Sequence, residues 1–468
     1  MMPAWDENVL LFMRAELPSR VKRLISQGRF DEAKKVILEA LRSAKEDLRR
    51  RLEFELDRIR RWRYEYPYTM AEALERLRRE IPDVKREELD VWLRRGCIDH
   101  RIINGEVRVL RRFVPNLFWL CPELKSRRLG LEDERAEMAR AALRSRVEKV
   151  IAAAREVGGG HVLPLLYRVR ASVRVKPGAV PEGETLRIWI PLPRSGALHP
   201  RVRVLDAEPK PLKVAPEDHP QRTAYFELEA SRCGAECWIE YEFISRGFYL
   251  EVDPRNVQGY DEGSDLYRRY TSERPPHIAF TPYLRELAER IVGDEENPYL
   301  KARRIWEWVT NNVRYTYARD YALYDNISEY VARNRRGDCG MQALLFITLC
   351  RIAGVPARWQ SGWYVLPLRP GMHDWAQFYV EPYGWLYADP SFGNMRHGEK
   401  WRNEFYFGSI EGYRMAANVE VSAQFDPPKQ HFRSDPVDNQ RGEVEWREGN
   451  LYYDVWEYDF KILETRRL

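Results

Sequence analysis

A cysteine stands at the start of the most apolar stretch of this sequence. Cys339 follows the polar segment RNRRGD, and the residues from there to Ala353 are almost all apolar. A helix that is apolar on nearly every side is buried within a domain; Asp338 is suited to cap its first turn, and Gly354 and Pro356 predict its end. The helix dipole and the free N–H groups of that turn favour a thiolate, so the pattern indicates a nucleophile. The alternative is a small buried hydrophobe.

A thiol nucleophile needs a base, and the base needs a partner that orients it. His373 opens a predicted strand in HDWAQFYVEPYGWLYADPSFG, and a turn near Glu381–Gly384 returns the chain to Asp389. The separation between His373 and Asp389 is even, so a hairpin that pairs them directly places both side chains on one face, within reach of a hydrogen bond. A tighter turn would shift this register. Asp374 should point the opposite way, as an exposed strand carboxylate.

Both segments resemble one known family. The blocks GDCGMQALLFITLCRIAGVPARWQSGW and HDWAQFYVEPYGWLYADPSFG are similar to the transglutaminase-like domain of the papain-like cysteine enzymes. That family has a cysteine at a helix start, an AGxPAR exit, a strand histidine and a hairpin aspartate in this order. The similarity covers residues 333–393, and IWEWVTNNVRYTY resembles the family's lead-in, so the domain should span about 280–410. The resemblance implies Cys339 as nucleophile, His373 as base and Asp389 as the orienting carboxylate.

The chemistry that follows is acyl transfer through a thioester. His373 would take the proton of Cys339, the thiolate would attack an amide carbonyl, and Asp389 would hold the imidazole tautomer. The backbone N–H of Cys339 is a natural donor to the oxyanion. Tyr315 and Tyr317, in VRYTY, are candidates for a side-chain donor.

The sequence therefore predicts a cysteine peptidase or other thiol-dependent amide hydrolase, with a protein or peptide as substrate. A transglutaminase-type acyl transferase that forms isopeptide bonds stays open, because both reactions share one acyl-enzyme. A non-catalytic scaffold or a winged-helix regulator is the third alternative, and the intact cysteine, histidine and aspartate argue against it. The substrate and the oligomeric state do not follow from the sequence.

Several features depart from the family. Asp374 stands where relatives often have a small residue, and Asp338, beside the thiol, should oppose thiolate formation. Only about 60 residues follow the domain, where animal transglutaminases have two β-domains, and no acidic calcium loop is evident. The paired CxxC zinc motifs of peptide:N-glycanases are also missing. We expect neither a metal nor a cofactor.

The composition is that of an ordinary globular protein of 468 residues, with 32% charged and 44% hydrophobic residues and a net charge of +5. Six cysteines do not imply a disulfide framework. Cys233 and Cys237 form the only close pair, and either a local disulfide or two separate thiols fits them. The N-terminus does not resemble a signal peptide and no stretch approaches transmembrane length, so we expect a cytoplasmic protein without a membrane partner.

Hydrophobic periodicity predicts a multidomain α+β protein. Its second part holds two helices, the first with a Thr69–Glu72 capping box, and a hairpin turning at Asn104–Gly105. This order resembles a winged-helix module, but such modules often act as spacers, and we do not expect nucleic acid as a partner. Few contacts should cross the glycines 158–160. The predicted parts are a helical region (1–66), a winged-helix-like module (67–130), a connecting helix with a glycine linker (131–160), an antiparallel β-sandwich (161–255), and a papain-like, transglutaminase-like catalytic domain with a C-terminal strand extension (256–468).

Overall fold

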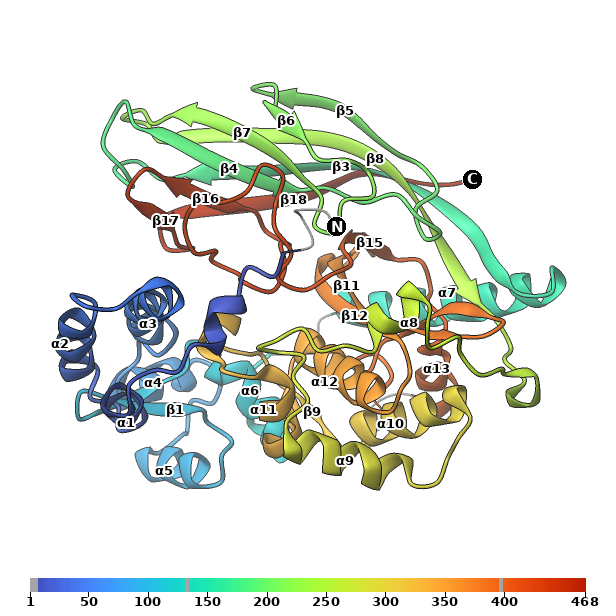
Figure 1. Ribbon diagram of the computed structural model, residues 1–468, viewed down its shortest axis with the longest axis horizontal. Helices are drawn as coiled ribbons and strands as arrows, with labels where there is room; N and C mark the ends of the chain where they lie inside the picture. The colour runs from blue at the N-terminus through green and yellow to red at the C-terminus, as the bar shows by residue number, and fades with distance from the viewer. Residues whose placement is uncertain (1–6, 131–133, 395–398) are drawn as a thin grey trace.

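The computed structural model describes residues 7–130, 134–394 and 399–468 of the chain. A helical N-terminal region, two long-stranded sheets and a mixed helix-and-sheet region pack against one another (Figure 1). The predicted mixed α+β architecture is confirmed. Within the described ranges, no helix combines the length and the apolarity that crossing a lipid bilayer requires.

Short helices make up the N-terminal region. α4 begins at the predicted capping box, in which Thr69 and Glu72 each accept the other's backbone N–H. β1 and β2 form the predicted hairpin, with Asn104 and Gly105 at positive φ in its turn. The two helices and the hairpin are thus present in the predicted order, while the winged-helix comparison stays a prediction. The elements are η2 (Leu11–Arg14), α1 (Ser19–Ser26), α2 (Phe30–Ala40), α3 (Glu46–Glu65), α4 (Met70–Arg78), α5 (Arg86–Arg94), β1 (His100–Ile103), β2 (Glu106–Val109), α6 (Phe113–Leu120) and η3 (Pro122–Arg127).

A disulfide joins Cys97, which follows α5, to Cys121, which follows α6. The sequence spacing did not single out this pair, because the two residues are brought together only by the packing of the two helices. Cys233 is exposed and Cys237 is buried, and both are free, so the alternative of two separate thiols holds. Disulfides are rare in the reducing cytosol of most organisms. The cytoplasmic location therefore stays a prediction.

Two antiparallel sheets occupy the middle of the chain. One has the strand order β17-β16-β4-β7-β6 and the other the order β18-β3-β8-β5. Side chains of both sheets, among them Val173, Ile188 and Phe226, share one hydrophobic core, as strands with one apolar face require. The first elements are α7 (Glu134–Glu156), β3 (Gly160–Val175), β4 (Thr185–Pro191), β5 (Val202–Glu208), β6 (Lys213–Val214), β7 (Thr223–Glu229) and β8 (Ala235–Tyr249).

The last three strands of the chain complete these sheets. β16 (Glu443–Trp446) pairs with β4, β17 (Gly449–Leu451) pairs with β16, and β18 (Trp456–Arg467) runs along β3. We expected this segment to extend the catalytic domain, and for these strands that boundary is wrong. The physical reason is that β3 and β4 would otherwise leave the backbone groups of one edge unpaired.

The mixed region carries Cys339. Its sheet has the order β14-β13-β12-β11-β15, and helices pack against it. The elements are η4 (Pro254–Asn256), α8 (Asp265–Tyr270), α9 (Pro282–Val292), α10 (Pro298–Asn312), β9 (Arg314–Tyr315), η5 (Tyr321–Leu323), α11 (Ile327–Asn334), β10 (Arg336–Gly337), α12 (Cys339–Ile352), β11 (Ala357–Tyr364), β12 (Gly371–Val380), β13 (Gly384–Ala388), α13 (Lys400–Phe405), β14 (Phe407–Gly408) and β15 (Arg414–Asn418).

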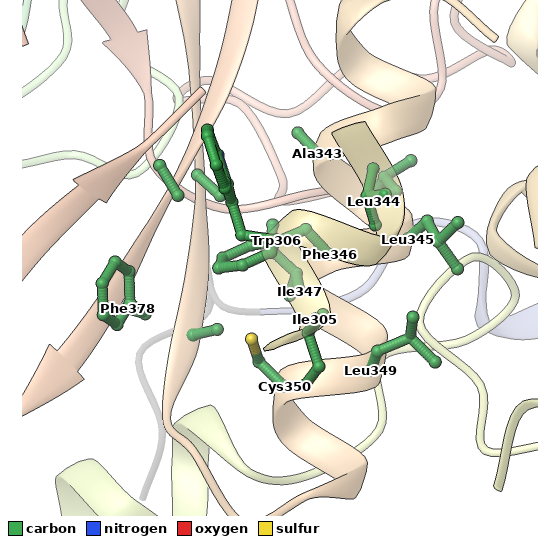
Figure 2. Close-up of a cluster of buried hydrophobic side chains, with 14 of the residues drawn as sticks. Ile305, Trp306, Ala343, Leu344, Leu345, Phe346, Ile347, Leu349, Cys350 and Phe378 are labelled. Carbon is green, nitrogen blue, oxygen red and sulfur yellow. The ribbon is translucent and has the colours of Figure 1, made fainter. Parts of the chain in front are cut away.

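α12 is the centre of this region. All of its residues except Ile352 are buried, as the sequence predicted. Trp306 of α10 and Phe378 of β12 belong to the same hydrophobic cluster as Leu344 and Phe346 of the helix (Figure 2). Each fully buried leucine or phenylalanine contributes about 2 kcal/mol to stability. Apolar side chains therefore enclose α12 along most of its length.

Contacts between the N-terminal region and the rest of the chain are extensive. Arg61 of α3 has no exposed side-chain surface, and its guanidinium pairs with Asp320 at 2.9 Å. The same group donates to the backbone oxygens of Ser434 (2.6 Å) and Arg433 (2.7 Å). The expectation that few contacts cross the glycine run is therefore wrong, because one buried charge joins three parts of the chain.

Replacing Arg61 with Leu should lower the free energy of unfolding by about 3–5 kcal/mol, because it leaves Asp320 without its buried ion-pair partner. Arg60→Leu is the matched control: the Arg60 side chain is 56% exposed and pairs with Asp57 at 3.0 Å. The control should change stability by less than about 1 kcal/mol. Urea denaturation measures both. Equal losses for the two variants would contradict this role of Arg61.

Candidate active site

Cys339 is the first residue of α12 and lines a cavity of about 690 Å³. Asp338 caps the helix as predicted, accepting the backbone N–H of Met341 at 3.1 Å, and it also accepts the hydroxyl of Tyr321 at 2.6 Å. The next residue, Gly340, occupies a position without room for a side chain. A Cβ atom there would collide with the Tyr321 hydroxyl and with a carboxylate oxygen of β12. Cys339 as a whole is 8% exposed. It therefore faces the cavity from a tightly packed turn.

His373 and Asp389 meet as the sequence predicted. His373 Nε2 donates to Asp389 Oδ2 at 2.6 Å. Of the two registers that the sequence left open, the structure has the shifted one: Val380 pairs with Gly384 and Ala376 with Ala388, which places Asp389 opposite Trp375. A shift of two residues keeps both side chains on the same face of the sheet. The hydrogen bond therefore survives the change of register.

An arginine also contacts Asp389. Arg414 of β15 approaches Asp389 Oδ2 at 3.0 Å, and Glu411 in turn binds Arg414 at 2.8 Å. Burial by itself would raise the pKa of Asp389, but His373 and Arg414 outweigh it and lower that pKa. Burial lowers the pKa of His373 against the opposing pull of Asp389. At neutral pH the pair is a carboxylate and a neutral imidazole whose Nδ1 is left to accept a proton.

Asp374 is not the exposed carboxylate that we expected. It does point away from His373, but that direction leads to α12 rather than to solvent, and the residue is only 5% exposed. The Cys339 thiol donates to Asp374 Oδ2 at 3.3 Å, and Gln440 Nε2 donates to Asp374 Oδ1 at 2.7 Å. The hydrogen-bond partner of the thiol in this structure is thus Asp374 and not His373.

The surroundings of the thiol favour its neutral form. Burial raises the pKa of Cys339 well above its usual value, and the carboxyl groups of Asp374 and Asp338 raise it further. These effects outweigh the helix end that we expected to favour a thiolate. Burial also raises the pKa of Asp374, together with the nearby Asp438 and Asp338. A thiolate therefore forms only when the shared proton leaves the Cys339 thiol and the Asp374 carboxyl group. The neutral imidazole of His373 lines the same cavity.

Tyr315 and Tyr317, the predicted oxyanion donors, both line the cavity. Tyr315 ends β9, which pairs in parallel with β10, and β10 ends two residues before Cys339. Burial, followed by the Cys339 and Asp338 groups, raises the pKa of Tyr315, so its hydroxyl keeps its proton. Tyr317 is fixed through its backbone, which exchanges two hydrogen bonds with the Asn116 side chain at 2.7 and 2.9 Å.

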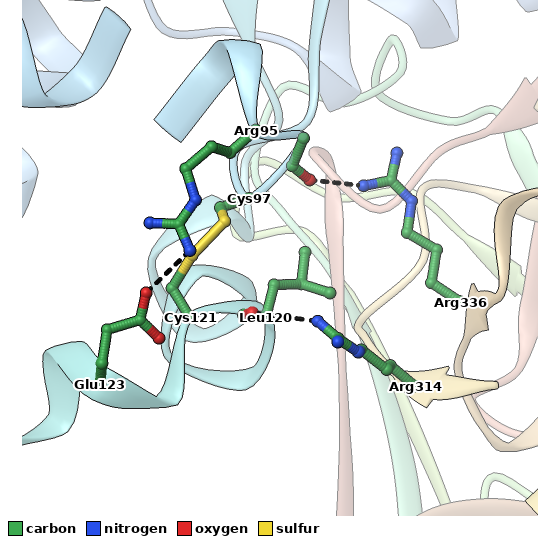
Figure 3. Close-up of a disulfide and its surroundings, with 8 residues drawn as sticks. Arg95, Cys97, Leu120, Cys121, Glu123, Arg314 and Arg336 are labelled. Atoms are coloured by element: carbon green, nitrogen blue, oxygen red, sulfur yellow. Dashed lines mark hydrogen bonds and ion pairs between the residues drawn. A yellow bond between two sulfur atoms is a disulfide. The ribbon is translucent and has the colours of Figure 1, made fainter. Parts of the chain in front are cut away.

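The N-terminal region contacts β9 and β10 near its disulfide (Figure 3). Arg314 donates to the backbone oxygen of Leu120 at 3.3 Å, and Arg336 donates to that of Gly96 at 2.9 Å. Leu120 and Gly96 each precede one cysteine of the Cys97–Cys121 disulfide. The disulfide thus holds together the two backbone positions that anchor β9 and β10. Sequence reasoning did not find this support, because no motif links the two regions.

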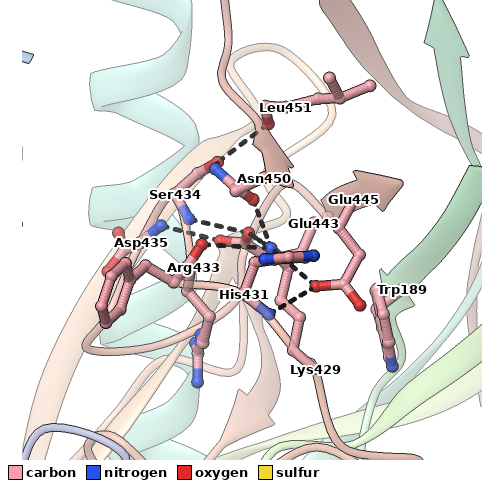
Figure 4. A network of polar contacts seen from close by, with 12 residues as sticks. Trp189, Lys429, His431, Arg433, Ser434, Asp435, Glu443, Glu445, Asn450 and Leu451 are labelled. Atoms are coloured by element: carbon pink, nitrogen blue, oxygen red, sulfur yellow. Dashed lines mark hydrogen bonds and ion pairs between the residues drawn. The ribbon is translucent and has the colours of Figure 1, made fainter. Parts of the chain in front are cut away.

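The segment between β15 and β17 forms another wall of the cavity. Lys429 pairs with Glu443 at 3.3 Å, and Glu443 accepts the backbone N–H groups of Ser434 and Asp435, each at 2.8 Å (Figure 4). This network fixes the segment that presents Gln440 to Asp374. Sequence reasoning missed Gln440 and Arg414, because both come from beyond the recognised blocks. Among the described residues, no group of three or more His, Cys, Asp or Glu side chains is placed to hold a metal ion.

Replacing Asp374 with Asn should speed alkylation of Cys339 by iodoacetamide about tenfold at pH 9, because an amide does not oppose the thiolate. The gain should shrink as the pH falls, since the wild-type carboxyl loses its charge below its raised pKa. Peptide mapping by mass spectrometry follows the Cys339 adduct. Asp459→Asn, an exposed strand carboxylate of β18, should leave the rate unchanged. A gain that is the same at pH 6 and pH 9 would show that Asp374 acts on packing rather than on charge.

Comparisons with known proteins match part of the chain. Residues 285–390 match the family described as the transglutaminase-like superfamily. An uncharacterized protein of Haemophilus influenzae is 27% identical over 175 residues, which cover 31% of this chain and 45% of that protein. The uncharacterized protein YebA of Bacillus subtilis is 22% identical over 149 residues, which cover 28% of this chain and 19% of YebA. The match thus spans less than half the length of both curated relatives.

Two solved structures are similar over a larger share of the chain. A candidate cysteine protease from Cytophaga hutchinsonii is 16% identical, with a TM-score of 0.44, and the match covers 66% of this chain and 92% of that one. The periplasmic domain of TgpA from Pseudomonas aeruginosa is 14% identical, with a TM-score of 0.27, and the match covers 53% of this chain and 90% of that one.

Proposed function

Residues 285–390 form a transglutaminase-like domain, and from this premise we propose that the protein is a thiol-dependent amide or peptide hydrolase with Cys339, His373 and Asp389 as its triad. The observation that carries the proposal is the hydrogen bond of 2.6 Å between His373 and Asp389 at the cavity that Cys339 also lines. A scaffold without activity would not need a buried, ionised carboxylate to orient a neutral imidazole.

Catalysis begins with proton transfer from Cys339 Sγ to His373 Nδ1. The thiolate attacks the carbonyl carbon of a bound amide, and the tetrahedral intermediate expels the amine, which takes the proton from the imidazolium. Asp389 stabilises that imidazolium, and Arg414 keeps Asp389 ionised. A water molecule, deprotonated by His373, then attacks the thioester, and the carboxylic acid and the free thiol are released.

The oxyanion forms next to the first turn of α12. The backbone N–H of Cys339 is one donor, and the Tyr315 hydroxyl is the second, since its raised pKa keeps it protonated at neutral pH. Asp374 delays the first step, because its carboxylate favours the neutral thiol. The reaction therefore depends on His373 to remove the proton after substrate has bound and water has left the cavity.

Cys339→Ser should abolish cleavage of a mixed peptide library, and Asp389→Asn should lower kcat/KM by about 10³–10⁴-fold with the fold retained, because the imidazole loses its tautomer control. Mass spectrometry of the products in H₂¹⁸O, with and without an added primary amine, separates hydrolysis from acyl transfer. Label in the new carboxylate supports the hydrolase, and amide products with the amine support the transferase.

The matched control is Asp265→Asn, whose side chain is 99% exposed on α8. It should cleave the library at the wild-type rate, and circular dichroism should show the same spectrum for all three variants. Wild-type turnover in Asp389→Asn would contradict the proposed role of Asp389. Wild-type turnover in Cys339→Ser would remove the thiol mechanism.

A further inference from the structure

The cavity at Cys339 is lined by acidic side chains that already have partners within the protein. Glu65 binds Arg111 at 2.7 Å, and Asp320 binds Arg61 at 2.9 Å. Asp435 accepts the backbone N–H of Val437 at 2.9 Å. The two carboxyl groups nearest the thiol, described above, accept hydrogen bonds from Tyr321 and Gln440. The acidic residues of the wall are thus satisfied without a ligand.

Two arginines that line the same cavity, Arg112 and Arg441, differ from these acidic residues in their contacts. Among the contacts of the described residues, neither Arg112 nor Arg441 forms an ion pair. The guanidinium of Arg112, at the start of α6, lies 4.9 Å from the centre of the Tyr317 ring. That of Arg441 lies 4.4 Å from the centre of the Tyr453 ring, and its Nε approaches Met372 Sδ at 3.1 Å. Aromatic rings orient a guanidinium but do not neutralise its charge.

These two arginines come from opposite ends of the chain and reach the nucleophile from different walls. Burial raises the pKa of Asp338, the neighbour of Cys339, and Arg112 is close enough to oppose that rise. Arg441 follows Gln440, which binds the carboxyl group that accepts the thiol hydrogen bond. Its contact Met372 directly precedes His373. One guanidinium therefore lies on the Asp338 side of the thiol and the other on the side of β12.

The charge balance of the cavity is positive. Burial raises the pKa of Asp374 well above its usual value and, with the nearby Asp438, raises the pKa of Asp435 to about 8. Asp435 is therefore largely protonated at neutral pH, and the negative charge of Asp374 is disfavoured by its surroundings. Arginine keeps its charge under all these conditions. Seven arginines line the cavity, against five aspartate and glutamate residues.

We propose that this cavity binds an acidic peptide, with a carboxylate next to the scissile amide held by Arg112 or Arg441 as specificity-determining residues. The part of this inference that concerns the scissile bond rests on the proposed hydrolase function. The binding of an anion in the cavity does not depend on that function. A guanidinium that is already stacked on a ring loses little conformational freedom when it forms a bidentate pair with a carboxylate. The enclosed cavity strengthens that pair by excluding water.

A pair of alkylating reagents tests the charge of the cavity without turnover. Iodoacetate and iodoacetamide have nearly the same shape and differ in one negative charge. The rate ratio of iodoacetate to iodoacetamide at Cys339, divided by the same ratio for glutathione in the same buffer, should exceed one at low salt. It should fall about three- to tenfold in Arg112→Gln and in Arg441→Gln, and towards one in 1 M salt.

The controls separate charge from structure. Arg112→Lys and Arg441→Lys keep the charge and should keep most of the preference for iodoacetate. Arg232→Gln removes a positive charge from a side chain that is 87% exposed and remote from the cavity, and should leave the ratio unchanged. A wild-type ratio at or below that of glutathione, or a ratio that neither glutamine variant lowers, would overturn the proposal.

Peptide cleavage provides the second arm. Pairs of peptides that differ by Glu or Gln beside one amide bond should be cleaved at different rates, with kcat/KM higher for the Glu peptide by about tenfold and the difference lost in Arg112→Gln or Arg441→Gln. Equal rates for both peptides would refute the acidic specificity and leave the hydrolase standing. If no peptide is cleaved, the hydrolase fails, and the alkylation ratio still decides whether the cavity prefers an anion.

Discussion

Burial of α12 on every side is the constraint from which the rest of the site follows. A helix without a polar face cannot turn its first residue to solvent on its own, so Cys339 becomes accessible only where neighbouring elements leave a cavity. The sheet packs against the flank of this helix, and the alternation along β12 then separates two neighbours: Asp374 contacts the thiol, while His373 contacts Asp389, and both line the cavity. One strand thus presents the proposed base and a competing carboxylate on its two faces.

The charges around the proposed triad form two separate systems. On one face, Glu411, Arg414, Asp389 and His373 form a buried chain in which every charge has a partner, so that the carboxylate stays ionised and the imidazole stays neutral. On the other, the carboxyl groups of Asp374 and Asp338 lie close to the thiol. Among the described residues, no cation forms an ion pair with either of them. The first system suits His373 to its proposed role as base, while the second favours the protonated form of the proposed nucleophile.

The remainder of the chain closes the cavity. α6 fixes the backbone of Tyr317 through Asn116, and the disulfide keeps the supports of β9 and β10 in place. The segment before β16 contributes Gln440 and is held by the buried pair of Lys429 and Glu443. The guanidinium of Arg61 joins α3 to Asp320 and to the backbone oxygen of Ser434. The N-terminal helices and the C-terminal strands are therefore parts of the site's enclosure.

The sequence alone determined the helix that starts at Cys339, its cap at Asp338, and the common face of His373 and Asp389. Each of these depends on residues close together in the chain or on the period of two in a hairpin, and such patterns survive a change of register. Only the tertiary structure decided that Asp374 meets the thiol, that Arg414 binds Asp389, that the last strands complete the distant sheets, and that Cys97 and Cys121 are bonded. Those contacts join different elements, from Cys97 and Cys121 at a separation of 24 residues to β3 and β18 in distant parts of the chain, and they depend on which layer covers which face. Local periodicity can predict that a side chain points away from its neighbour, but what it meets there is set by the packing of the whole chain.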